Sequence, residues 1–187
     1  MIIKKTLTLL TILFCFALCI SAQEKIESEE YEVYRVLLGD GYQSVVSKFS
    51  VDEELKSIFK VRKRELSVVQ SETRKSYKQR NQKSFELQEN FGIKPNVKLV
   101  VGEDVNSFFE MARKNELAAE NAFYEKFGSR TLVYLSRVGF NENKDQALVS
   151  YTSNTGLCGT CSTNYIFVLS KQKGAWKIEK KVMGWIS

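Results

Sequence analysis

Residues 146–171 read QALVSYTSNTGLCGTCSTNYIFVLSK, and this stretch decides the expected fold. Both of its ends are rich in β-branched and aromatic residues, which is typical of strands, and a loop with Gly156 and Gly159 separates them. We expect strands over Gln146–Ser153 and Tyr165–Lys171. Because consecutive strands with short connections are usually antiparallel neighbours, the stretch predicts the centre of an antiparallel sheet.

Similar segments lie on both sides of this centre. Thr131–Phe140 precedes it and Trp176–Trp185 follows it, and both are rich in Val, Ile, Tyr, Phe and Trp. Together the four segments predict a C-terminal meander. Val97–Val101 and Leu66–Val69 are weaker strand candidates, whereas residues 42–49 fit a strand or a helix equally well.

The aromatic residues are expected to build the core. Trp176 and Trp185 carry the largest apolar groups available to cover a sheet face, so we expect at least one of them to be mostly buried. Six further aromatic residues stand at helix spacing and are expected in the core rather than on a ligand-stacking surface: Tyr31, Tyr34, Phe108, Phe109, Phe123 and Tyr124.

Helix signals dominate the N-terminal half. We expect a helix over Glu29–Leu38, between Ser28 and Gly39, and another over Glu72–Lys83, after Ser71. A further helix is expected through Leu55, Ile58 and Phe59 after Ser50, and one more carries Val105, Phe108, Phe109 and Ala112 on one face. The last expected helix is Glu116–Phe127, between Asn115 and Gly128. In the last of these, we expect Leu117, Phe123, Tyr124 and Phe127 to point inward. The sequence therefore predicts an α+β fold with N-terminal helices packed on a C-terminal antiparallel sheet of about four strands.

The first residues have the pattern of a signal peptide. Lys4 and Lys5 precede the apolar run Thr6–Ile20, which is shorter than the roughly 20 residues that cross a bilayer, and the small residue Ala22 precedes the expected cleavage point. We therefore expect residues 1–22 to be removed and residues 23–187 to form a single α+β domain. Export would make the protein periplasmic or secreted, and not an integral membrane protein after cleavage.

The C-terminal part also resembles a known group of proteins. The segments LSRVGFNENKDQALVSY, GLCG and YIFVLSKQKGAWKIEKKVMGWIS, all within Leu135–Ser187, are similar to the closing segment of a family of uncharacterised exported bacterial proteins. The resemblance implies export and no particular activity. Members of that family tend to carry a second cysteine four positions before the one matching Cys158, where this chain has Asn154.

The absence of histidine excludes several classes of function. A chain without histidine forms no Ser-His-Asp triad, Cys-His protease, HExxH zinc site or histidine-ligated haem. Gly-rich phosphate loops are also absent, and no sequence pattern identifies a catalytic nucleophile or a pair of catalytic carboxylates. We therefore expect no bound cofactor or metal, and we assign no catalytic residue.

Cys158 and Cys161 are the one motif with recognisable chemistry. After signal cleavage they are the only cysteines left, and export would place them in an oxidising compartment. A redox CxxC usually opens a helix, whereas this one lies in a loop between two expected strands. We expect a disulfide between Cys158 and Cys161 that braces the loop, with a thiol–disulfide redox protein as the alternative.

Charge is distributed unevenly. Acidic residues predominate over residues 24–54, and basic residues predominate over Lys56–Lys83. Few aromatic residues accompany the basic segment, so we expect no specific nucleic-acid binding but a solvated surface, partly neutralised by the acidic segment. The acidic residues at the expected helix starts suit the positive end of the helix dipole.

By elimination, the sequence favours a non-enzymatic, exported interaction or structural module of the cell envelope. Its expected partner is a protein or another envelope component.

Overall fold

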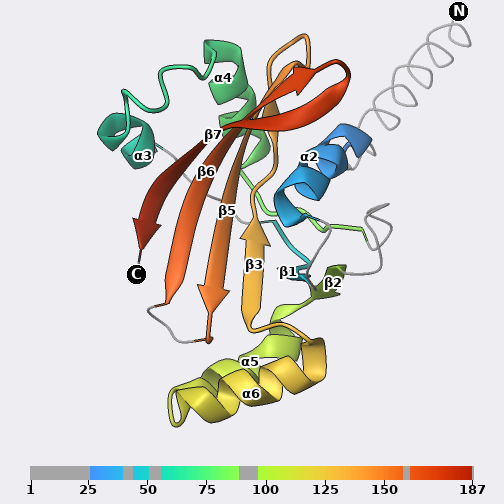
Figure 1. Ribbon diagram of the computed structural model, residues 1–187, viewed down its shortest axis with the longest axis vertical. Coiled ribbons are helices and arrows are strands. Elements are labelled where there is room, and N and C mark those ends of the chain that lie inside the picture. The colour runs from blue at the N-terminus through green and yellow to red at the C-terminus, as the bar shows by residue number, and fades with distance from the viewer. Residues whose placement is uncertain (1–25, 40–43, 51–55, 89–96, 158–160, 187) are drawn as a thin grey trace, which may run out of the picture.

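The computed structural model of the chain describes residues 26–39, 44–50, 56–88, 97–157 and 161–186. Within these residues, one mixed sheet has the strand order β2-β1-β3-β5-β6-β7, and β4 pairs with β5 (Figure 1). The strands are β1 Ser44–Ser47, β2 Val97–Val100, β3 Thr131–Leu135, β4 Gly139–Phe140, β5 Gln146–Thr155, β6 Ser162–Gln172 and β7 Ala175–Ile186. The helices are α2 Ser28–Leu38, α3 Lys56–Val61, α4 Ser71–Arg80, α5 Gly102–Ala112 and α6 Glu116–Phe127.

The expected antiparallel meander of about four strands is wrong for the sheet as a whole. The strand β1 lies between β2 and β3 and is parallel to both, whereas β3, β5, β6 and β7 are antiparallel neighbours. Parallel strands need long crossover connections, and the segments that contain α3 and α4, and then α5 and α6, supply them. The α+β class itself holds, and the described part of residues 42–49 contains a strand.

The expected strand over Thr131–Phe140 is interrupted in the structure. It divides into β3 and β4, and the segment between them contains Ser136 and Arg137. The Ser136 hydroxyl accepts a hydrogen bond from the backbone N–H of Ser150, and the Arg137 side chain binds a buried carboxylate. The Leu66–Val69 candidate is also wrong, because these residues form turns that bury Leu66 and Val69.

The three long C-terminal strands are confirmed. Lys173 and Gly174, with φ of 52° and 81°, connect β6 to β7. Two positive φ angles are the signature of a type I′ turn, whose twist matches that of the hairpin strands. Register shifts interrupt the pairing of β6 with β7 at two points, near Thr163 and near Val168.

The expected helix boundaries are confirmed in part: Ser28 and Ser71 lie inside α2 and α4, whose N-caps are Glu27 and Gln70, and α4 ends at Arg80 rather than at Lys83. Gly39, with φ of 63°, ends α2, and Gly128, with φ of 75°, ends α6. The Asn115 side chain accepts a hydrogen bond from the Ala118 N–H, as its capping position predicts. The prediction that Leu117 and Tyr124 point inward is wrong, since these side chains are 66% and 49% exposed.

Helices cover both faces of the sheet. On one face, α2 packs Tyr31, Val33 and Tyr34 onto residues that include Val149 and Leu169. On the other face, α3, α4 and the turns between them cover a second cluster, which consists of Ile58, Leu66, Val69, Tyr77, Leu148, Ile166, Val168 and Val182. Trp176 belongs to the α2 cluster and is 6% exposed, so the expectation that at least one tryptophan is buried is confirmed.

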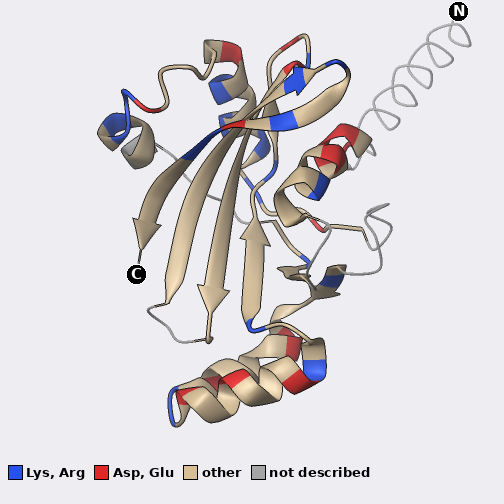
Figure 2. Ribbon diagram, in the orientation of Figure 1, with Lys and Arg blue, Asp and Glu red and all other residues tan. Residues whose placement is uncertain are grey.

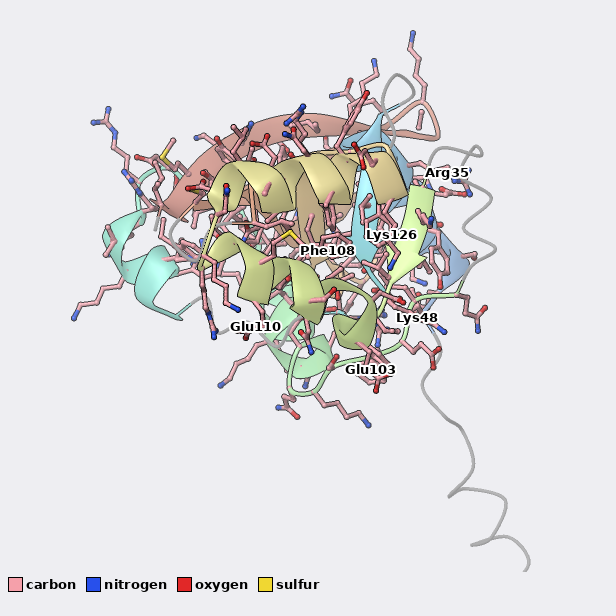
Figure 3. All side chains as sticks on the ribbon, turned by 90° about the horizontal axis from the view of Figure 1, so that it is seen from below. Arg35, Lys48, Glu103, Phe108, Glu110 and Lys126 are labelled. Atoms are coloured by element: carbon pink, nitrogen blue, oxygen red, sulfur yellow. The ribbon has the colours of Figure 1, made fainter. Side chains whose placement is uncertain are left out.

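The helices α5 and α6 close one end of the sheet (Figures 1 and 3). Phe108 of α5 meets Phe123 and Phe127 of α6 edge-on, with ring centroids 5.4 and 5.8 Å apart. These rings pack on Val45 and Leu132 of the sheet. The cluster therefore holds the parallel and the antiparallel parts of the sheet together.

Candidate interaction surface

One part of the α2-covered face is open to solvent. Residues directly opposite each other in antiparallel strands share a face, and the register aligns two rows across β3, β5, β6 and β7. The rows are Leu135–Tyr151–Tyr165–Met183 and Val133–Ser153–Thr163–Ile186. We call the outer part of these rows, together with Lys181, the open face: Tyr151, Ser153, Thr163, Tyr165, Lys181, Met183 and Ile186.

Exposure rises along both rows from the centre of the sheet to its edge. Leu135 and Val133 are buried, the residues of β5 and β6 are half-buried, and Met183 and Ile186 are 41% and 65% exposed. Trp185 lies between them in the chain and is 40% exposed. The expectation that Trp185 belongs to the core is therefore wrong. Large apolar side chains exposed together mark an interaction site more often than a solitary one does.

The open face is almost uncharged. Neither β5 nor the part of β6 up to Ser170 contains a charged residue, and β7 has none from Val182 to Ile186. In Figure 2 the lower parts of these strands carry no red or blue, whereas charges gather at the upper hairpins and at the start of α2. Aromatic and methionine side chains without charge are the composition enriched at protein interfaces.

Lys181 forms the charged border of the open face. Its Nζ lies 3.8 Å from the ring centroid of Tyr165 and 5.7 Å from that of Phe167, which is cation–π geometry. Burial raises the pKa of the Tyr151 hydroxyl, and Tyr165 beside it adds to that effect. The Tyr151 hydroxyl is therefore neutral at physiological pH and able to donate or accept a hydrogen bond.

The strand β7 is an edge of the sheet. It pairs with β6 on one side, and no other described strand pairs with it. An edge strand presents unpaired N–H and C=O groups, which are a template for another strand. The other described edge, β2, has only four residues, whereas β7 runs over twelve. The longer of these two described edges therefore adjoins the open face.

The carboxylates at the start of α2 form a structural ion network. Glu30 is fully buried and accepts hydrogen bonds from Arg137, Arg80 and the Val138 N–H. Glu29 accepts hydrogen bonds from Lys171 Nζ at 2.6 Å and from Trp176 Nε1 at 2.8 Å. The sequence predicted only a role at the helix start, whereas these residues fasten α2 to β7 and to the segment between β3 and β4.

Hydrogen bonding sets the ionisation of these carboxylates. Burial by itself would raise the pKa of Glu29, but the hydrogen bonds from Lys171 and Trp176 outweigh it and hold the pKa below its ordinary value. The pKa of Glu27 is lowered in the same way: burial opposes, and hydrogen bonds from Lys144 and Arg80 prevail. Both carboxylates are therefore charged in the folded protein at neutral pH.

The predicted disulfide stays a prediction, because Cys158 lies outside the described residues. Cys161 is exposed just before β6, and its Sγ lies 3.9 Å from Glu116 Oε1. The redox alternative therefore stays a prediction as well.

The basic segment is largely exposed. Lys60, Lys63 and Arg64 lie on the surface around the end of α3. Arg80 links the segment to the acidic one by binding Glu27 and Glu30. The described contacts therefore support partial neutralisation at Arg80, while the absence of specific nucleic-acid binding stays a prediction.

A shallow groove of about 240 Å³ lies between α4 and the start of the β4–β5 connection. Its lining mixes charges of both signs: Glu72, Lys75, Ser76, Gln79, Phe140, Asn141 and Glu142. The Asn141 and Ser76 side chains are already engaged in hydrogen bonds within the fold. The groove therefore offers no set of convergent groups that suggests a reaction.

The described part of the chain lacks two further features. No group of three or more Cys, Asp or Glu side chains there is arranged to hold a metal ion. No helix there is both long enough and apolar enough to cross a membrane.

Comparisons with family models, with characterised proteins and with solved structures give no match. The resemblance of Leu135–Ser187 to an exported family therefore stays a prediction.

Sequence reasoning missed most of the open face. Tyr151, Tyr165 and Met183 were assigned to strands without a role, although the uncharged run Gln146–Ser170 is a usable signal. A strand that alternates aromatic and hydroxyl residues without charge can present either face to solvent. Only the position of α2 over one half of the sheet shows which residues remain uncovered (Figure 1).

Proposed function

We propose that this chain is a non-enzymatic interaction module of the cell envelope that binds its partner through the open face. The observation that carries the proposal is the register-aligned row of half-buried Tyr151 and Tyr165 and exposed Met183 on an antiparallel sheet. Tyrosine and methionine supply large contact areas, and Tyr adds a polar group at its tip. A sheet held on both faces by helices presents these side chains with little loss of entropy on binding.

Export and an envelope partner belong to this proposal and rest on the sequence alone. The apolar run Thr6–Ile20 with its flanking lysines supports export. The uncharged aromatic face suits a protein partner better than a nucleic acid, whose phosphates require many cations at the contact.

Site-specific photo-crosslinking tests the proposed function. A photoreactive amino acid would replace Trp185 at the border of the open face and, as a matched control, the similarly exposed Tyr124 of α6. In the native envelope we expect position 185 to yield one defined adduct and position 124 to yield none. The adduct partner, once purified, should bind the unmodified protein and lose affinity for a Met183→Asp variant.

Equal labelling from both positions would mean non-specific contact and would contradict the proposal. Absence of any adduct from position 185, with full-length protein present in the envelope, would contradict it as well.

A further inference from the structure

We propose that β7 accepts an extended polypeptide segment as an additional antiparallel strand, and that this segment is apolar in its first half and acidic in its second. The inference rests on the proposed function and names the chemistry of the partner. It concerns the edge of the sheet as well as its open face. Strand addition uses the free backbone groups of an edge for affinity and the side chains beside it for specificity.

The edge formed by β7 is long, and no described strand pairs with its outer side. The strand β7 covers Ala175–Ile186, and no other described strand lies beyond it in the sheet. Figure 1 shows β7 as the outermost strand, with its last residues extending away from α2, while Ile58 of α3 packs beside Gly184 on the other face of the sheet. Because β5, β6 and β7 are antiparallel neighbours, an antiparallel addition continues the existing pattern.

The strand β7 divides into a basic half and an uncharged, apolar half. The first half carries Lys177, Lys180 and Lys181 against a single carboxylate, Glu179. The second half, Val182–Ile186, has no charge and exposes Met183, Trp185 and Ile186. In an antiparallel pair, the first residues of the partner lie opposite the last residues of β7. The partner therefore needs apolar residues first and acidic residues second.

The lysines of β7 are complementary in charge to an acidic partner segment. Neither Lys177 nor Lys180 has an ion pair with a carboxylate in the described structure, whereas Lys48, Arg80, Arg137, Lys144 and Lys171 do. Lysines on an edge strand also hinder pairing with another copy of the same strand, because like charges then approach each other. The same lysines favour a partner strand that carries carboxylates at the facing positions.

The test uses the exposed Trp185 as a fluorescent reporter. The probe is a ten-residue peptide whose first five residues alternate Val and Thr and whose last five alternate Glu and Thr. Its controls are the sequence-reversed peptide, which has the same composition and charge, and a version with alternate backbone nitrogens methylated to remove N–H donors. We expect saturable binding of the probe, with affinity at least about tenfold lower for each control.

Protein variants test the lysines. Lys177→Glu/Lys180→Glu should weaken binding of the probe by about tenfold, and the loss should shrink at high salt. The matched control Lys75→Glu/Lys114→Glu makes the same change in net charge at exposed positions of α4 and of the α5–α6 connection and should leave binding unchanged. Circular dichroism and thermal melting of both variants establish that each is folded.

Other results would overturn the inference. Equal binding of the probe and the reversed peptide would mean that the interaction depends on net charge alone and not on the order of apolar and acidic residues. A Trp185 response to a neutral polysaccharide but to no peptide would make the ligand a glycan. Self-association through β7, seen by sedimentation and abolished by a charge at Met183, would make the occupant a second copy. A defined crosslink from position 185 without peptide binding would leave the proposed function standing while this inference fails.

Discussion

Arg137 and Glu30 form a buried, bidentate ion pair between the β3–β4 segment and α2. Arg137 Nε donates to Glu30 Oε2 at 2.8 Å, and Nη2 donates to Glu30 Oε1 at 2.7 Å. Both side chains are almost completely buried. Across 107 positions of sequence, this contact fixes the helix that covers one half of the sheet and thereby defines the half that stays open.

Breaking this ion pair should lower the stability of the folded protein. Glu30→Ala leaves the Arg137 guanidinium buried without its carboxylate, and we expect a loss of about 3–5 kcal/mol in the free energy of unfolding. The double variant Glu30→Leu/Arg137→Leu should recover a substantial part of the lost stability, because it removes both buried charges. Urea unfolding of the two variants measures the difference. If the double variant is less stable than the single one, the pair does not act as a coupled unit.

Gly139 marks a close approach of β4 to α4. A Cβ at this position would lie 2.5 Å from the backbone N and Cα of Tyr77, so Gly139→Ala requires a shift of the backbone. We expect a clear drop in the melting temperature. The matched control is Gly102→Ala in the first turn of α5, where a Cβ meets nothing within 4 Å. This control should be neutral or slightly stabilising, since Ala has the higher helix propensity.

The two tryptophans of β7 should respond differently to truncation. Trp176 is buried against Phe140, with ring centroids 5.7 Å apart, so Trp176→Ala should cost about 3–5 kcal/mol. Trp185→Ala removes a partly exposed side chain and should cost much less. Thermal melting compares them directly. A larger loss for Trp185→Ala would place that indole in the core and remove it from the interaction surface.

The Glu29 network should make stability depend on pH in the acidic range. Hydrogen bonds from Lys171 and Trp176 hold the folded pKa of Glu29 below its ordinary value of 4.5. The stabilisation is therefore complete above that value and is lost as the pH falls through the folded pKa. We measure the free energy of unfolding in urea at a series of pH values from 7 to 3. It should decrease less with falling pH for Glu29→Gln than for the wild type. The control Glu125→Gln, at an exposed position of α6, should follow the wild type.

The C-terminal strands were predictable because their signal is local. The strands β5, β6 and β7 are long and rich in β-branched and aromatic residues, and a turn joins β6 to β7. The same holds for α6, whose ends carry Asn115 and Gly128. Each of these features is contained in a short window of sequence.

The parallel part of the sheet was not predictable in this way. The strands β1 and β2 have four residues each, and their pairing joins Ser44 to Val97 across a long connection. The open face was missed for the same reason. Whether Tyr151, Tyr165 and Met183 are covered depends on where α2 docks, and the contact of Glu30 with Arg137 helps to set that position.

Amide hydrogen exchange of β7 tests the central claim most directly. The measurement compares the free protein with the protein saturated by the apolar-then-acidic peptide, residue by residue, by NMR. We expect alternate amides within Lys177–Ile186, those that point away from β6, to exchange at least about tenfold more slowly in the complex. Unchanged exchange along β7 in a protein that has bound the peptide would contradict the claim that this edge and the face beside it are the interaction surface.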